Sequence, residues 1–268
     1  MNSSKNCLSY WFPKLKASGV PVPRTEIIKT RVPLVSLLDG TLPRGYRAFM
    51  ARLRQAADAI GYPCFLRTGQ TSGKHQWRHT CFVESSAVIP AHVAALVEFS
   101  ELAGFPIGLP YDVWAVRKLL RTRPVCVLPR YDNFPLVPEI RCFIDGGEIV
   151  CWHHYWPHQA IEEGFPYRMD DSTDSPSRDL PNDFEEIVSE AQIFVKGWRK
   201  VVCKVAQAFA GDGAWSVDLI PVLWPKTGRR HYVTDMAVAE DSFHWHSCPA
   251  NRWNAPEMDR QDLEQEST

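Results

Sequence analysis

The sequence lacks the features that mark several common classes of protein. No apolar run is long enough to span a bilayer, and the polar residues 1–6 lead into no apolar signal core, so we expect a cytoplasmic protein with no membrane partner. Lys and Arg number 30 against 31 Asp and Glu, so nucleic acid is not an expected partner, although a local basic groove is compatible with this balance. No Gly-x-Ser-x-Gly elbow supports a serine hydrolase.

The eight cysteines include no C-x-x-C pair and are spread over the whole chain. The sequence therefore supports neither a zinc knuckle nor a thioredoxin-type redox motif. Most of these cysteines lie in apolar runs, such as Cys64 within residues 62–66. Because unpaired cysteine is among the most buried residue types, we expect buried, reduced thiols instead of a disulfide framework.

The composition that is present is typical of a globular chain. Of 268 residues, 45% are hydrophobic and 23% are charged, which excludes whole-chain disorder, collagen and coiled coil. The length allows one large domain or two small ones. Ten Trp and 21 Pro indicate many strands and angular loops.

Hydrophobic periodicity predicts an irregular mixture of helices and strands. Apolar residues recur at helical spacing over residues 44–60, 91–103 and 183–209. Strand patterns occupy residues 63–67, 80–84, 113–119, 125–128, 139–145, 148–155, 214–221 and 231–236. Gly146 and Gly147 predict a hairpin, and residues 170–182 predict a polar loop. Since strands and helices do not alternate regularly, the expected fold class is α+β.

A loop of small and basic residues follows the strand at 63–67 and runs from Arg67 to His75. Small residues let a backbone approach a phosphate closely, and Arg67 and Lys74 add positive charge. The loop is not a P-loop, because three residues instead of four separate its glycines, His75 replaces Ser or Thr, and a strand is expected where a helix is needed. The alternative is a plain hairpin loop with two cations.

Charged residues also interrupt three apolar strands. Glu139 and Arg141 would share one face of a strand, which indicates a polar cleft or, alternatively, a surface ion pair. Asp218 and Asp235 each lie inside an apolar run, where carboxylates tend to be paired or metal-bound. They would either share a divalent cation or act as two separate, hydrogen-bonded structural acids.

In this order, the loop, the Glu139–Arg141 pair and the two acidic strands resemble the ATP-grasp superfamily over residues 60–245. The resemblance implies an ATP-grasp fold, in which two α+β subdomains clasp ATP. It implies that the nucleotide is bound by Arg67, Thr68, Gly69, Ser72, Gly73 and Lys74 at the phosphates, and by Lys118, Leu119 and Leu120 at the adenine. It further implies catalytic roles for Glu139 and Arg141, and Mg²⁺ binding by Asp218 and Asp235.

One branch of the superfamily is closer. Residues 7–15, Glu26–Ile28 and Leu38–Gly40 are similar to the opening of the eukaryotic cell-division-cycle-123 type proteins, which assist assembly of a translation initiation factor. Residues 139–144 resemble the Glu-Phe-Arg-Cys-Phe-Val run of that branch. Two functions stay open: an ATP-dependent carboxylate–amine (or thiol) ligase that acts through an acylphosphate, or an ATP-binding assembly chaperone that grips a protein partner.

Two positions depart from the superfamily pattern. The Asn expected two residues after Asp235 is Ala237, which cannot bind metal, and Glu240 or Asp241 is a candidate substitute. At the strand end, Arg67 stands where Lys is commoner. Both changes bear on catalysis more than on the fold. The expected organisation is an N-terminal segment at 1–60, a small central subdomain at 61–120, a large subdomain at 121–255 and a frayed acidic tail at 256–268.

The histidines at His153, His154 and His158 look like metal ligands. In an extended strand, however, the first two point to opposite faces, and Pro157 argues against a helix that would join His154 to His158. The pattern therefore favours a position lining the cleft near the acceptor over a zinc site made by these residues.

Overall fold

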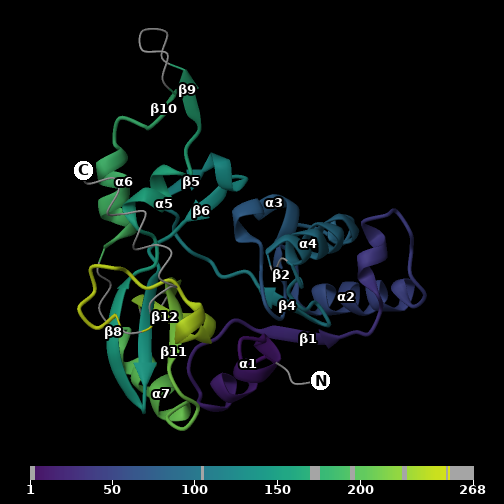
Figure 1. Cartoon of the computed structure of the whole chain (residues 1–268), viewed down its shortest axis with the longest axis horizontal. Helices are drawn as coiled ribbons and strands as arrows, with labels where there is room; N and C mark the ends of the chain where they lie inside the picture. Colours follow the sequence, from purple (N-terminus) through teal and green to yellow (C-terminus); the bar gives the residue numbers. More distant parts are fainter. Residues whose placement is uncertain are drawn as a thin grey trace.

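The computed structural model describes residues 4–103, 106–169, 176–193, 197–224, 228–251 and 253. Two four-stranded antiparallel sheets form its centre, so the fold is α+β as the sequence predicts. Figure 1 shows the two sheets side by side. None of the helices in the described ranges combines the length and the apolarity that a membrane crossing requires.

The small sheet has the strand order β1-β4-β2-β3. Its strands are β1 (Thr25–Lys29), β2 (Cys64–Thr68), β3 (Phe82–Val83) and β4 (Val113–Lys118). Helices α2 (Tyr46–Ile60) and α4 (Ile89–Ala103) supply apolar side chains that pack with Leu66 and Trp114 in one buried core. Because side chains alternate along a strand, Arg67 and Arg117 lie on the opposite face of the sheet, away from this core.

The large sheet has the strand order β12-β11-β7-β8. Its strands are β7 (Ile140–Asp145), β8 (Glu148–His154), β11 (Trp215–Trp224) and β12 (Gly228–Val238). Helices α1 (Leu8–Ala17) and α7 (Arg199–Ala208) contribute to the core on one face, together with Cys142 and Trp215. The hairpin predicted at Gly146 and Gly147 is confirmed: both residues have positive φ, +54° and +88°, which the favoured two-residue hairpin turn requires.

A third group of elements lies above the sheets in Figure 1. It consists of the hairpin β5 (Cys126–Leu128) and β6 (Phe134–Leu136), α5 (His158–Glu162), the pair β9 (Tyr167–Met169) and β10 (Pro176–Arg178), and α6 (Phe184–Ala191). Its core combines Leu128, Trp156 and Phe184 with Trp77 from α3 (Trp77–Thr80). Short 3-10 turns occupy Leu34–Leu37, Lys74–Gln76, Pro129–Tyr131 and Ala239–Asp241.

The helix predicted at 183–209 is wrong as a single element. The structure has two helices in this range, α6 and α7. Gly197 precedes α7 and has φ +100°, which does not occur inside an α-helix. Phe194 and Val195, which belong to the predicted apolar stripe, lie outside the described residues. Helix α1 is not predicted by the sequence, because Pro13 inside it disfavours a helix, yet Leu8, Trp11 and Leu15 bury it against the large sheet.

Two further expectations need correction. The strand expected at 80–84 begins only at Phe82, because the loop leads first into a 3-10 turn and then into α3. The polar loop expected at 170–182 includes strand β10, which pairs with β9. Residues 170–175 of that loop lie outside the described ranges.

Candidate functional site

A cavity of about 1020 Å³ lies between the two sheets. Its lining comes from β2 and the loop that follows, from β4 and residues 119–122, and from β7, β11 and β12. The lining contains seven cationic side chains against three carboxylates. This volume reaches the upper end of the usual range for ligand sites, roughly 300–1,000 Å³. The excess of positive charge suits an anionic ligand.

The large sheet presents a row of polar side chains to this cavity. In the strand register, Asp218 of β11 lies opposite Asp235 of β12 on one side and opposite Arg141 of β7 on the other. His153 of β8 in turn lies opposite Arg141. Residues directly opposite one another share a face of the sheet, so the two acids and the arginine belong to one continuous polar row.

Arg141 and Asp218 form a bidentate ion pair. The Nε and Nη2 atoms of Arg141 donate to Oδ1 and Oδ2 of Asp218, each at 2.8 Å. Burial opposes the charge on Arg141, but the neighbouring Asp218 outweighs it and the pKa of Arg141 is raised. The guanidinium also lies over the ring of Tyr155, 4.6 Å from its centroid. A ligand that binds Asp218 or Arg141 therefore competes with this ion pair.

Asp235 pairs with the small sheet. Its Oδ1 atom lies 2.9 Å from Nη1 of Arg67 on β2 and also accepts a hydrogen bond from the backbone N–H of Met236. Arg67 is buried, whereas the Asp235 side chain is 40% exposed. This ion pair connects the two sheets across the cavity.

Lys74 and Glu139 form a third pair, with Nζ 3.4 Å from Oε2. Burial opposes the charge on Lys74, but Glu139 and Tyr155 outweigh it, and the pKa of Lys74 is raised. Burial raises the pKa of Glu139, against the opposing effect of Lys74. A carboxyl group with a raised pKa beside a fixed cation is suited to proton transfer in a cleft.

The loop after β2 divides into two parts. Ser72, Gly73 and Lys74 line the cavity, whereas Thr68 and Gly69 do not. Thr68 Oγ1 accepts from the backbone N–H of Gln70 and Thr71, which fixes the turn. Gly69 lies under the start of α1: a Cβ atom there would lie 2.5 Å from Cys7 Sγ, so this glycine serves packing.

Of the other residues predicted from the sequence, some line the cavity and some do not. Besides the residues already described, the cavity lining includes Lys118, Leu119 and Leu120. Glu240 and Asp241 do not line it, and Asp241 accepts a hydrogen bond from Asn6 at 2.6 Å. Ala237 lies opposite Ser216 in the register, and Ser216 is bonded to Ser242 Oγ at 2.6 Å.

Arg117 is a cavity residue that the sequence reasoning missed. It is buried, its Nη1 donates to the carbonyl of Thr234 at 2.6 Å, and its Nη2 has no hydrogen-bond partner in the described part of the chain. Burial and then the nearby charge of Arg67 lower the pKa of Arg117 to about 9. The sequence could have indicated this position, because alternation along the strand pattern at 113–119 places Arg117 on the face of the strand opposite Lys118.

Comparisons with known proteins give structural likenesses only. No protein-family model matches the sequence, and no curated protein matches it. The chain is similar to C-terminally truncated Cdc123 from Schizosaccharomyces pombe, with 12% identity, a TM-score of 0.48, and alignment over 89% of this chain and 87% of that one.

Two bacterial structures are also similar. One is an ATP-grasp RimK domain protein from Sphaerobacter thermophilus, with 12% identity, a TM-score of 0.42 and coverage of 87% of this chain and 58% of that one. The other is D-alanine–D-alanine ligase from Bacillus anthracis complexed with ATP, with 13% identity, a TM-score of 0.38 and coverage of 87% and 54%. The chain thus spans little more than half the length of these two proteins. At such identities and TM-scores, activity has to be argued from the chain's own side chains.

Proposed function

We propose that the chain binds ATP together with Mg²⁺ in the cavity between its two sheets. One observation carries the proposal: cations from both sheets surround a single cavity that also contains two facing carboxylates, Asp218 and Asp235. The four innermost cations are Arg67, Lys74, Arg117 and Arg141. Guanidinium and ammonium groups pair with phosphate oxygens, so this lining suits a polyphosphate.

Asp218 and Asp235 fit a magnesium ion, because Mg²⁺ is usually bound by one or two carboxylates together with phosphate oxygens and waters. Without a ligand, each carboxylate is neutralised by an arginine, Arg141 or Arg67. The bound ion would neutralise charge on the phosphates. The two arginines would then pair with phosphate oxygens, and the two carboxylates would coordinate the metal ion.

The remaining lining residues suit the other parts of ATP. Ser72, Gly73 and Lys74 come from the loop that faces the phosphate end of the cavity. Leu119 and Leu120 lie beyond Lys118, the last residue of β4 in register with β2. Their backbone groups are therefore placed beyond the sheet pairing, where an adenine edge can use a donor and an acceptor.

The chemistry that we propose is ATP-dependent ligation of a carboxylate to an amine or thiol. A carboxylate oxygen attacks the γ-phosphorus, the bond to the β–γ bridging oxygen breaks, and ADP leaves. The amine or thiol then attacks the acyl carbon, loses its proton and displaces phosphate. Arg141 would stabilise the charge that develops on the transferred phosphoryl group, and Glu139 is placed to accept a proton.

A second candidate function is an assembly chaperone that binds ATP and grips a protein partner. Two observations favour it. Asp218 accepts hydrogen bonds from two of the three guanidinium nitrogens of Arg141, and the position two residues after Asp235 carries the methyl group of Ala237. Both features weaken magnesium coordination, and a chaperone needs ATP only to stabilise one conformation.

The test is ADP release by the purified chain, measured with ATP and Mg²⁺ alone and with panels of carboxylates and amines. Calorimetric titration of ATP with and without Mg²⁺ accompanies it. ADP formed only with an acceptor pair supports the ligase, whereas binding without turnover supports the chaperone. A Glu240→Gln variant should bind ATP and release ADP as the unaltered chain does, because the Glu240 carboxylate is exposed and does not line the cavity. Absence of any Mg²⁺-dependent binding of ATP would overturn the proposal.

A further inference from the structure

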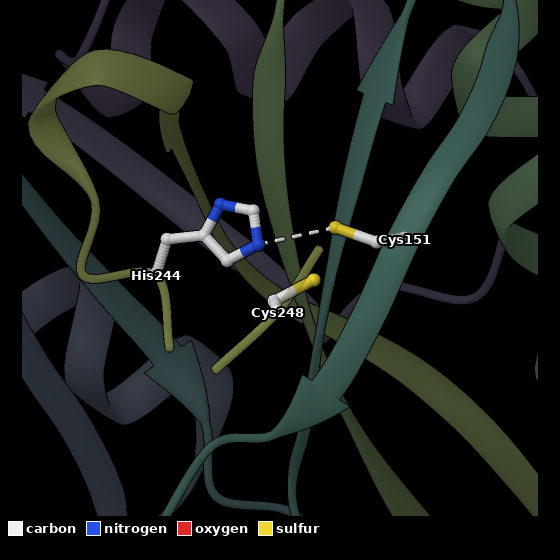
Figure 2. Close-up of side chains that lie close together, drawn as sticks. All are labelled: Cys151, His244 and Cys248. Atoms are coloured by element: carbon white, nitrogen blue, oxygen red, sulfur yellow. Dashed lines mark hydrogen bonds between the residues drawn. The ribbon is translucent and has the colours of Figure 1, made fainter. Parts of the chain in front are cut away.

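Three side chains of types that bind metals lie close together between β8 and the segment that follows β12 (Figure 2). Cys151 Sγ, His244 Nε2 and Cys248 Sγ all lie within 4.8 Å of one another. The His244 Nε2 atom lies 3.2 Å from Cys151 Sγ. Cys151 comes from the edge strand β8, and the other two residues come from the segment that follows the turn Ala239–Asp241.

The spacing of these atoms is close to that of a zinc site. With Zn–S of about 2.3 Å and Zn–N of about 2.0–2.1 Å, neighbouring ligands of a tetrahedral ion lie roughly 3.5–3.8 Å apart. The 3.2 Å separation of Cys151 and His244 therefore has to widen by only a few tenths of an ångström. Thiolate and imidazole are the ligands that Zn²⁺ prefers in proteins.

The electrostatics of the cluster suit such an ion. His244 Nε2 faces Cys151 Sγ at 3.2 Å, and a neutral imidazole is a common zinc ligand. Cys151 and Cys248 form no disulfide, so both sulfurs can bind as thiolates. Two thiolates balance the charge of Zn²⁺, so the occupied site adds no net charge beside Arg141.

His153 lies beside the cluster but outside the group whose ligand atoms are within 4.8 Å of one another, so it would have to move to become a fourth ligand. It lies on the same face of β8 as Cys151, and its ring centroid is 5.5 Å from that of His244. Its Nδ1 is bonded to the carbonyl of His154, whereas its Nε2 is buried without a hydrogen-bond partner among the described residues. A buried nitrogen lone pair with no partner is costly, and coordination would satisfy it.

A path to the cluster exists. A second cavity, of about 300 Å³, is lined by His153, Trp245 and Cys248. Cys151 and Cys248 are only partly buried, so an ion can reach the sulfurs from solvent.

We propose that Cys151, His244 and Cys248 bind one zinc ion, which fastens the segment after β12 to the edge strand β8. This segment also contributes the carbonyl of Phe243, which accepts a hydrogen bond from Arg141 Nη1 at 3.3 Å. The ion therefore supports the arginine that holds Asp218 in the nucleotide site.

The experiment measures bound metal by plasma mass spectrometry on the full chain, purified without chelators and after exposure to micromolar zinc. We expect one zinc per chain. Cys151→Ser and Cys248→Ser should each lose it, whereas Cys203→Ser should keep it, because Cys203 is an exposed cysteine on α7. Cobalt-loaded protein should show thiolate-to-cobalt charge-transfer absorption and the visible bands of a tetrahedral ion.

A chelator titration of the wild-type chain covers the case in which the cysteine variants do not fold. Removal of zinc should lower the thermal midpoint, and added zinc should restore it. The proposal is overturned if the wild-type chain neither contains zinc nor takes it up, or if Cys203→Ser loses as much zinc as Cys248→Ser. It is also overturned if mass spectrometry finds Cys151 and Cys248 joined in a disulfide in the protein as isolated. None of these readouts depends on ATP binding.

Discussion

Arg67 and Asp235 form an ion pair across the cavity, with the arginine Nη1 2.9 Å from the carboxylate Oδ1. The two residues belong to different sheets, so the pair holds β2 against β12 before any nucleotide binds. ATP with Mg²⁺ would replace this contact with two others, arginine to phosphate and carboxylate to metal. If ATP and Mg²⁺ bind as proposed, the charged groups that would meet them are already in place, which would lower the cost of ordering the site.

We predict that Asp218 and Asp235 act as one magnesium site. Asp218→Asn and Asp235→Asn should each weaken Mg²⁺-dependent ATP binding by tenfold or more, about 1.4 kcal/mol. The double variant should lose little beyond either single one, because both residues serve the same ion. Calorimetric titration of ATP at several Mg²⁺ concentrations measures this coupling. Fully additive losses would show two independent structural acids.

The same variants should differ in the stability of the ligand-free chain. Asp218→Asn leaves the buried Arg141 without its counter-charge, so the free energy of unfolding should fall by about 3 kcal/mol or more. Asp235 is 40% exposed, so solvent partly screens its pair with the buried Arg67, and Asp235→Asn should cost less than Asp218→Asn. Urea denaturation of both variants makes the comparison, and equal losses would contradict this difference in burial.

The two loop glycines should respond differently to substitution. Gly73 has φ +58° and faces the cavity, so Gly73→Val should weaken ATP binding more than adenosine binding, because only the phosphates meet the loop. Gly69→Ala should instead lower stability by about 1–3 kcal/mol through its clash with Cys7 and Val113. Thermal melts with ATP, with adenosine and without ligand separate the two effects. Equal loss of both ligands in Gly73→Val would remove this loop from the phosphate site.

Ala237→Asn should tighten magnesium binding. Ala237 is two residues after Asp235 on β12, so its side chain lies on the same face of the sheet. An amide oxygen there adds a third protein ligand, which should lower the Mg²⁺ concentration needed for half-maximal ATP binding by about tenfold. Ala237→Val is the control of similar bulk without an oxygen. No difference between the two variants would mean that the ion does not lie beside this position.

Arg117→Met should separate nucleotide binding from stability. Arg117 Nη2 is buried and has no hydrogen-bond partner among the described residues, and an apolar side chain of similar length is often neutral or stabilising in place of a buried charge. ATP affinity should nevertheless fall about tenfold, because a cation facing the phosphates is lost. Arg54→Met, at an exposed position of α2, is the matched control. Unchanged ATP affinity in Arg117→Met would exclude this arginine from the phosphate site.

The sequence by itself determined the features that depend on neighbouring residues. The β7–β8 hairpin follows from Gly146 and Gly147, because a tight turn needs two residues that adopt positive φ easily. The positions of Asp218 and Arg141 inside strands follow from apolar runs with period-two alternation, and Glu139 directly precedes the strand of Arg141. These are interactions over a few residues, so the pattern in the chain is enough to predict them.

Only the tertiary structure decided which charges meet. Asp218 pairs with Arg141 because β11 lies beside β7, and Asp235 pairs with Arg67 because the two sheets face one cavity. Cys151 and His244 are 93 residues apart, so the absence of a C-x-x-C motif gave no information about their convergence. Such partners are set by strand order and register between distant segments. Strand order and register depend on burying the apolar cores of both sheets at the same time, so no short stretch of sequence determines them.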